Sequence, residues 1–432
     1  MDIREKIKDR ILSLEDAANK VPKGDCVLVS MGVGVPYPLL NTVSEHTEEM
    51  LLLTGLLANP VKAFLKPYSD KITVYNWFFG PIERMAMGMK SRLSFQPMHL
   101  SDTTFDRTGK HSPDTVLIQV CPRIEDGLLS QGPSPLPTAA IEKARLVIAQ
   151  INECVPFVRG EGTMVPVEKI DYFTEAAEDL YSMALVEPNE TDKQIASHIV
   201  DKIDDGSCIQ LGIGGVGTAV GSFLKEKKEL SIHSEMFVDS MVDLMECGAV
   251  TNSRKELLPG KTVFGFASGN KIMYDFLGKR DDVLTRPFEW VNDPRTVAQI
   301  SNFVSINSAM EIDLTGQVCA ESIGLKQYSG TGGQYDFVKG AHWSPGGKSF
   351  IAMPSSRTDK KGKRFSKISL TLPPGAAVTT LRSDVHYVVT EYGAVDLQNE
   401  PLDIRAKRLI SIAHPEFRES LEKEAKAAGL II

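Results

Sequence analysis

The sequence predicts an α/β fold built from two halves that look related, and three observations predict it. Short apolar runs rich in β-branched residues recur along the chain, as expected of strands covered on both faces. Amphipathic stretches with helical spacing lie between these runs. A strand, a Gly-x-Gly turn and a helix follow one another in each half, with the turns at residues 32–34 and 212–214. Such alternation is typical of α/β architecture.

The individual elements follow from these patterns. The predicted strands are the apolar runs at residues 26–34, 71–77, 115–121, 144–152, 208–215, 303–307, 349–353 and 385–390. The predicted helices are the amphipathic stretches at residues 2–20, 138–144 and 190–203. Thr191 is placed to cap the third helix.

The chain is long enough for two large domains. It has 432 residues, of which 42% are hydrophobic and 24% charged, as in an ordinary globular enzyme. The segment around residues 185–191 is polar, contains a proline and precedes a new helix and strand. We therefore expect one domain over residues 1–190 and a second over residues 191–432.

Charge and cysteine content exclude several classes of protein. The formal net charge is 48 − 56 = −8, which argues against a nucleic-acid-binding protein. No apolar run approaches the ~18 residues of a membrane span, and the N-terminus lacks the pattern of a signal peptide. The six scattered cysteines form neither a CxxC pair nor a Cys/His cluster. We expect buried thiols, no metal site and a cytoplasmic location.

Two features of the second half could carry chemistry. Residues 212–217 read Gly-x-Gly-x-x-Gly, and Glu235 follows about 20 residues later. This spacing is that of a dinucleotide-binding fingerprint, so a nicotinamide oxidoreductase stays open. The same glycines would equally let backbone N–H groups approach an anion or oxyanion. Glu235 itself lies in an apolar run, where a carboxylate is costly unless it is hydrogen-bonded or functional.

Three further segments have patterns that suit a ligand. Glycine-rich turns occur at residues 329–333 and 344–348, and six basic residues lie within 357–367, where they could contact phosphates. Glu391 follows a predicted buried strand, at the end where α/β proteins commonly bind ligands. Each pattern is also compatible with an ordinary loop or turn.

Several motifs together resemble the acetyl-CoA hydrolase/transferase family, most closely its 4-hydroxybutyrate and butyrate:acetate CoA-transferase branch. The motifs are HSEMFVDSMVDL, NDP at 292–294, SINSAMEIDLTGQV, GTGGQYDFVKGA, SPGGKSFIAM and VTEYGAVDL, with DGLLSQGPS and EKARLVIAQIN earlier. The resemblance implies a fold like that of the class I CoA-transferases. Such a fold has two related domains with open, mostly parallel sheets covered by helices.

The resemblance also implies roles for particular residues. Glu235 corresponds to the nucleophile, and Ile213 and Gly333 to the backbone donors of an oxyanion hole. The residues implied to lie against coenzyme A are Leu211, Gly212, Ile213, Gly214, Asn292, Gly332, Gly333, Lys361 and Glu391. Lys361 is chosen from Lys360, Lys361 and Lys363, which the motif does not separate. The role of His342 and Trp343 is left open.

The implied activity is ping-pong transfer of coenzyme A between a short-chain acyl-CoA and a carboxylic acid through a glutamyl-CoA thioester. Acyl-CoA and small carboxylates are the expected substrates, with no tightly bound cofactor, and a homo-oligomer, dimer or tetramer, is expected. An acyl-CoA hydrolase could use the same site. A non-catalytic acyl-CoA-binding protein is a further alternative. The acyl group is not specified by the sequence.

Overall fold

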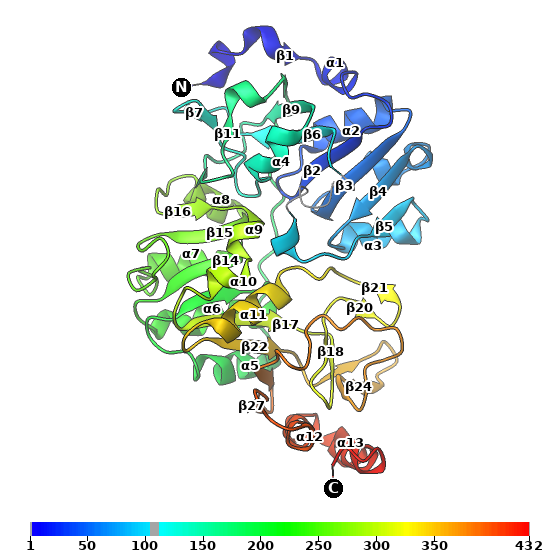
Figure 1. Cartoon of the computed structure of the whole chain (residues 1–432), viewed down its shortest axis with the longest axis vertical. Coiled ribbons are helices and arrows are strands. Elements are labelled where there is room, and N and C mark those ends of the chain that lie inside the picture. The colour runs from blue at the N-terminus through cyan, green and yellow to red at the C-terminus, as the bar shows by residue number, and fades with distance from the viewer. Residues whose placement is uncertain (1, 104–111, 432) are drawn as a thin grey trace. The chain divides into compact units, whose positions relative to one another are not determined.

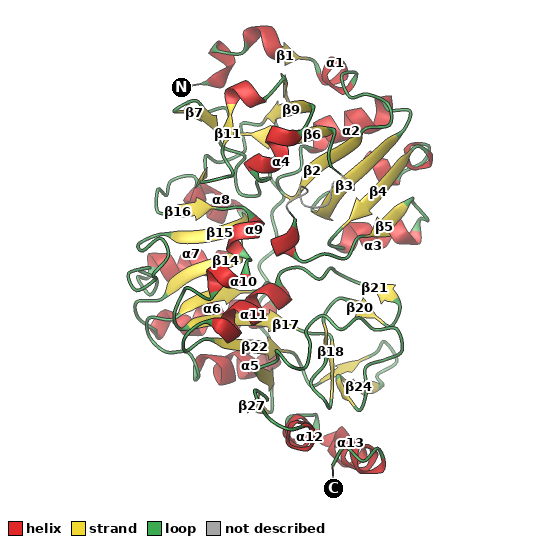
Figure 2. Cartoon of the chain, viewed as in Figure 1, coloured by secondary structure: helices red, strands yellow, loops and turns green. Residues whose placement is uncertain are grey.

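The computed structural model describes residues 2–103 and 112–431, which form two compact units. The first unit comprises residues 1–184, 235–237 and 263–291, and the second comprises residues 185–234, 238–262 and 292–432. In both units, helices pack along the strands of a large sheet (Figures 1 and 2). The predicted α/β class is therefore confirmed. The division into residues 1–190 and 191–432 stays a prediction.

The first unit contains an eight-stranded sheet with the order β1-β12-β9-β6-β2-β3-β4-β5. Every neighbouring pair is parallel. Its strands are β1 (Ile11–Leu12), β2 (Cys26–Gly32), β3 (Met50–Leu57), β4 (Ile72–Asn76), β5 (Leu93–Phe95), β6 (Thr115–Val120), β9 (Leu146–Ile151) and β12 (Tyr172–Glu175). β2, β6 and β9 are buried along their whole length, which explains their uninterrupted apolar sequences.

Helices and shorter strands complete this unit. The helices are α1 (Leu14–Ala18), α2 (Tyr37–His46), α3 (Pro81–Gly88), α4 (Thr138–Lys143), α8 (Lys271–Leu277) and α9 (Phe288–Val291). A small antiparallel sheet has β7 (Ile124–Glu125), β8 (Leu128–Leu129) and β11 (Val165–Pro166). Further strands are β10 (Arg159–Gly160), β15 (Thr262–Ala267) and β16 (Val283–Thr285).

In the second unit, the strands of the large sheet lie in the order β14-β13-β17-β22-β26-β27. The strands are β13 (Cys208–Leu211), β14 (Ser231–Phe237, whose first four residues belong to this unit), β17 (Phe303–Ser308), β22 (Lys348–Ala352), β26 (Tyr387–Thr390) and β27 (Gly393–Asp396). All pairs are parallel except β26 with β27, which form a tight antiparallel hairpin. The carboxyl ends of β13, β17, β22 and β26 therefore share one edge.

The helices of this unit are α5 (Glu190–Val200), α6 (Gly215–Phe223), α7 (Asp239–Glu246), α10 (Pro294–Val297), α11 (Gln334–Trp343), α12 (Leu402–Ser411) and α13 (Pro415–Ala427). Small sheets are formed by β18 (Glu311–Asp313), β19 (Val318–Cys319) and β25 (Ile368–Ser369), by β20 (Ser322–Ile323) with β21 (Lys326–Gln327), and by β23 (Ser356–Thr358) with β24 (Arg364–Ser366). An apolar core that includes Ile312, Ile351, Val388 and Leu409 joins β18, β22, β26 and α12.

The eight predicted strands are all present, but some other predictions were wrong. The cap of α5 is Asn189, whose side chain accepts a hydrogen bond from the Asp192 backbone N–H, and Thr191 lies inside the helix. Cys154 and Cys247 are exposed, whereas the other four cysteines are buried, and all six are free thiols. Among the described residues, no helix is both long and apolar enough to span a membrane.

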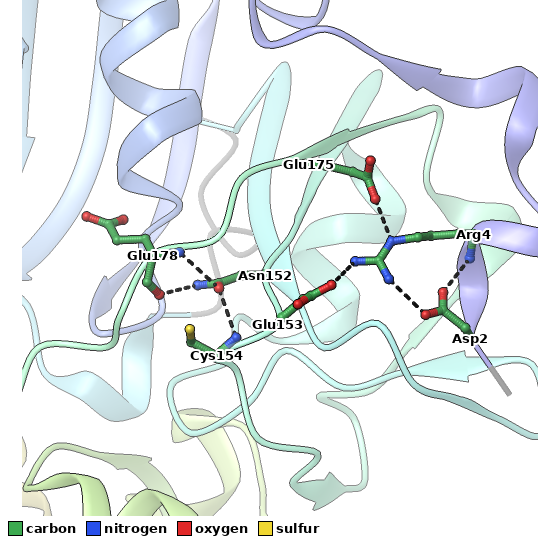
Figure 3. A network of polar contacts seen from close by, with 7 residues as sticks. All are labelled: Asp2, Arg4, Asn152, Glu153, Cys154, Glu175 and Glu178. Carbon is green, nitrogen blue, oxygen red and sulfur yellow. Dashed lines mark hydrogen bonds and ion pairs between the residues drawn. The ribbon is translucent and has the colours of Figure 1, made fainter.

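The predicted helix over residues 2–20 was also wrong. This segment forms two single 3₁₀ turns, then β1, then α1, which begins afresh after the Ser13 cap. Tertiary contacts override the helical pattern, because β1 pairs with β12 and Arg4 is held by three carboxylates. The Arg4 guanidinium contacts Asp2 at 2.9 Å, Glu153 at 2.6 Å and Glu175 at 2.5 Å (Figure 3).

Asn152, directly after β9, ties the segment after β12 to the first sheet (Figure 3). Its side-chain amide donates to Gln119 and to the Glu178 carbonyl, and its oxygen accepts from the backbone N–H groups of Cys154 and Glu178. The side chain is 1% exposed. The Asn152 side chain therefore satisfies three partly buried backbone groups of Cys154 and Glu178.

Replacing Asn152 with alanine is expected to destabilise the protein by about 2–4 kcal/mol, because four buried or partly buried polar groups lose their hydrogen-bond partner together. Chemical denaturation measures this change in the free energy of unfolding. The matched control is Glu153→Ala, whose side chain is 64% exposed and makes one ion pair, and we expect a change below about 1 kcal/mol. Equal effects for the two variants would contradict the role given to Asn152.

Candidate active site

The turn after β13 is shaped by glycine. β13 is fully buried and ends at Leu211, and Gly212, Ile213 and Gly214 connect it to α6. Gly214 has φ +100°, a backbone conformation that favours glycine, and forms the N-cap of α6 without a side-chain hydrogen bond. A Cβ on Gly217 would lie 2.2 Å from the Gly212 carbonyl oxygen, so the turn packs closely on the first helical turn. The Ile213 side chain is 52% exposed.

Glu235 is the fifth residue of β14, a strand that runs parallel to β13. Its neighbours on either side, Ser234 and Met236, are buried, and Glu235 itself is half-buried. Packing fixes the strand on both sides of the glutamate. The His233 ring lies edge-on to two aromatic rings of the second unit, and the Phe237 ring contacts two aromatic rings of the first. The carboxylate is therefore carried by a rigid element.

Lys255 supports the beginning of β14. Its ammonium group donates to the backbone carbonyls of Ile232, at 3.0 Å, and of Lys261. The side chain is buried, and this burial lowers the pKa of Lys255 from 10.5 to about 8.

A pH-dependent contribution to stability follows for Lys255. Between pH 8 and 10.5 the unfolded chain binds more protons than the folded one, so the free energy of unfolding should rise with pH in that window. The cost of burying the charge is fully present below pH 8. The expected rise is about 3 kcal/mol, measured as the difference in denaturation free energy between wild type and Lys255→Met. A difference that does not change with pH would contradict this assignment.

A second glycine turn precedes α11. Gly330, Gly332 and Gly333 are buried, Gly332 has φ +58°, and Gly333 forms the N-cap of α11. Gln334, the first residue of the helix, donates through its side-chain amide to the Ser308 carbonyl at the end of β17, at 2.7 Å. This bond attaches the turn to the carboxyl edge of the sheet in the second unit.

Glu391 directly follows β26 and is held by Ser355, which lies beyond the end of β22. One carboxylate oxygen accepts from the Ser355 backbone N–H at 2.8 Å, and the other accepts from the Ser355 hydroxyl at 2.6 Å. Ser355 is fully buried, so the Glu391 carboxylate has a fixed orientation. Sequence reasoning missed Ser355, since a serine in a loop carries no distinctive signal.

The remaining predicted residues lie in different surroundings. Asn292 is fully buried between α9 and α10. Lys361 is exposed at the tip of the β23–β24 hairpin, where its backbone N–H donates to Asp359. Lys367, from the same basic run, was not singled out. Lys367 is half-buried, and burial lowers its pKa although the carboxylates of Glu311 and Glu391 oppose the shift.

The second unit therefore brings several predicted residues to one edge of its sheet. The turn 212–214 follows β13, the turn 330–333 is bonded to the end of β17, and Glu391 follows β26. Parallel strands commonly form ligand sites at this edge, because loops and helix N-termini meet there. Among residues 2–103 and 112–431, no group of three or more His, Cys, Asp or Glu side chains is arranged to hold a metal ion.

Comparisons with known proteins identify the family. Residues 1–187 match the acetyl-CoA hydrolase/transferase N-terminal domain, and residues 269–425 match the C-terminal domain of the same family. The chain is 39% identical to the 4-hydroxybutyrate coenzyme A transferase of Clostridium kluyveri, over 99% of each protein. It is 36% identical to the butyryl-CoA:acetate CoA-transferase of Anaerostipes caccae, over 100% of this chain and 99% of that protein.

The solved structures agree with this result. The crystal structure of RipA from Yersinia pestis covers 100% of both chains at 32% identity, with a TM-score of 0.91. The chain belongs to the acetyl-CoA hydrolase/transferase family. Within that family it is an enzyme of the CoA-transferase class, as its full-length relatives are named. This assignment favours the CoA-transferase interpretation of the glycine turn at 212–217 over the nicotinamide one.

Proposed function

We propose that this enzyme transfers coenzyme A between a short-chain acyl-CoA and a small carboxylic acid through a glutamyl-CoA thioester on Glu235. The observation that carries the proposal is a half-buried glutamate fixed within an otherwise buried strand of a CoA-transferase fold. Placing a carboxylate in such surroundings has a desolvation cost, and functional sites are where such costs are retained. Acetate, butyrate and 4-hydroxybutyrate are the class of acid we propose.

The chemistry proceeds by acyl transfer. A Glu235 carboxylate oxygen attacks the thioester carbonyl, the C–S bond breaks, and coenzyme A leaves as a thiolate, which gives a mixed anhydride. The thiolate then attacks the glutamyl carbonyl and releases the first acid as its carboxylate. The glutamyl-CoA thioester that remains reacts with the acceptor carboxylate by the same steps in reverse. Each intermediate stays activated, so no ATP is consumed.

Each tetrahedral intermediate carries an oxyanion, which needs fixed donors. We propose the backbone N–H groups of Ile213 and Gly333 for this role. Both residues lie in glycine turns next to a helix N-terminus, where N–H groups are not used by the helix itself. A carboxylate nucleophile is neutralised as it forms the anhydride, so the developing charge is on the carbonyl oxygen that these donors would face.

We propose that coenzyme A lies against Leu211, Gly212, Gly214, Asn292, Gly332, Lys361 and Glu391. The glycines would allow close approach of the ligand to the backbone. Ser355 holds Glu391 in one orientation, so its carboxylate can act as a fixed acceptor. Lys361, exposed on its hairpin, can reach a phosphate without losing an existing side-chain interaction that the structure records.

Covalent trapping tests the proposal. The protein is incubated with acyl-CoA alone, reduced with borohydride and digested, and the modified peptide is identified by mass spectrometry. We expect the peptide bearing Glu235 to be modified, with parallel initial-rate lines for acyl-CoA and acetate. An unmodified Glu235 peptide would overturn the mechanism. Release of free coenzyme A without an acceptor acid would instead identify a hydrolase, since water is then the acceptor.

A further inference from the structure

A short segment distant in sequence supports the glycine turn at residues 330–333. Thr379 and Thr380 lie between β25 and β26 and pair with Val318 through backbone hydrogen bonds of 2.8 and 3.1 Å. Their side chains are 6% and 0% exposed. The Thr379 hydroxyl donates to a residue that precedes the turn, and the Thr380 hydroxyl donates to a residue that follows it.

Thr379 acts on the side that precedes the turn. Its hydroxyl accepts from the Ala320 backbone N–H at 3.0 Å and donates to one carboxylate oxygen of Glu321 at 2.9 Å. The other oxygen of Glu321 accepts from the hydroxyl of Thr331, inside the turn, at 3.4 Å. The Glu321 carbonyl also accepts from the backbone N–H groups of Tyr328 and Ser329. Glu321 therefore fixes the chain that enters the turn.

Thr380 acts on the side that follows the turn. Its hydroxyl donates to the side-chain oxygen of Gln334 at 3.1 Å, and the Gln334 amide donates to the Ser308 carbonyl. Gln334 is 9% exposed and is the residue next to Gly333. Thus Gly332, with φ +58°, and Gly333 lie between two anchored positions.

We propose that Thr379, Thr380, Glu321 and Gln334 are positioning residues that set the direction of the Gly333 backbone N–H. Four buried polar side chains cost free energy that apolar residues of the same size would not. A fully hydrogen-bonded network can, in return, hold one backbone geometry. This inference rests on the proposed function, because it assumes that the Gly333 N–H binds the oxyanion.

The test uses isosteric variants of the full-length enzyme. Thr379→Val and Thr380→Val each remove one hydroxyl with little change of shape. A displaced donor weakens transition-state binding, so we expect kcat to fall about 10-fold in each and on the order of 100-fold in the double variant. The KM for acyl-CoA should change less than about twofold. Thr379→Ser and Thr380→Ser keep the hydroxyl and should restore kcat.

Thr54→Val is the matched control. Thr54 is fully buried on β3, and its hydroxyl makes one hydrogen bond to the Ser30 carbonyl in the first unit. We expect the Thr54→Val protein to be less stable than wild type but to have the wild-type kcat. Thr331→Val removes the hydrogen bond from the Thr331 hydroxyl to Glu321. Thr331 is half-buried, so this variant can be used if a variant at one of the buried threonines does not fold. We expect kcat to fall several-fold in this variant as well.

The rate of glutamyl-CoA formation separates the two proposals. If wild type forms the adduct on Glu235 and the Thr→Val variants form it more slowly, both proposals are supported. If the folded Thr→Val or Thr331→Val proteins form it at the wild-type rate, the positioning role is wrong and the proposed function stands. If wild type forms no adduct, the proposed function itself fails.

Discussion

Replacing Glu235 with alanine is expected to lower kcat for coenzyme A transfer by on the order of 10⁴-fold or more, because the variant cannot form the proposed covalent intermediate. The protein should still fold, since the side chain that is removed is half-buried and the buried residues of β14 on either side of it are unchanged. Steady-state transfer assays and thermal unfolding measure the two effects. Loss of activity together with retained stability would distinguish chemistry from misfolding.

The choice of substitution and a matched control make this experiment decisive. Glu235→Gln is less suitable, because slow deamidation could regenerate the glutamate. The matched control is Glu178→Ala, because Glu178 is also a half-buried glutamate. Burial raises the pKa of the Glu178 carboxyl. We expect Glu178→Ala to transfer coenzyme A at nearly the wild-type rate. Substantial activity in Glu235→Ala would mean that another group is the nucleophile.

The second large effect is expected from Gly217→Ala. The new Cβ would lie 2.2 Å from the Gly212 carbonyl oxygen, so the turn that carries Ile213 must move. Displacing the proposed oxyanion donor should lower kcat by on the order of 10²- to 10³-fold, and the strain should reduce stability by about 1–3 kcal/mol. The rate is measured per folded molecule, so that the two losses are separated.

Gly88→Ala is the control for this variant. Gly88 is also a helical glycine, at the end of α3, and a Cβ there would meet nothing within 4 Å. We expect unchanged activity and a gain in stability of up to about 1 kcal/mol, because alanine favours a helix more than glycine does. If Gly217→Ala also kept its full kcat, the close packing of its turn would have no catalytic importance.

Much of the fold could be predicted from the sequence, because buried parallel strands leave long apolar runs. β2, β6 and β9 are of this kind. The N-terminal segment shows that a local pattern alone does not determine structure. Its helical spacing was correct as a pattern, yet pairing of β1 with β12 and the ion pairs of Arg4 favour another structure. Such contacts arise between residues more than 140 positions apart, and a local pattern cannot reveal them.

The sequence indicates some residues of the candidate site but not the residues that orient them. The motifs point to Glu235, the two glycine turns and Glu391, because those residue types and spacings are distinctive, and their roles stay predictions. The groups that orient them were missed. Ser355 and Thr379 are ordinary polar residues in loops, and only the folded chain brings them to Glu391 and Glu321. Recognising them required the hydrogen bonds themselves.

The exposure of the Ile213 side chain determines which amino acids this position can accept. At this position the backbone N–H is the proposed oxyanion donor, and every amino acid except proline supplies the same amide hydrogen. The side chain, 52% exposed, is therefore free to vary without removing that hydrogen. A substitution at position 213, natural or engineered, can therefore change the side chain near the proposed thioester carbonyl. The backbone hydrogen bond to its oxygen is kept.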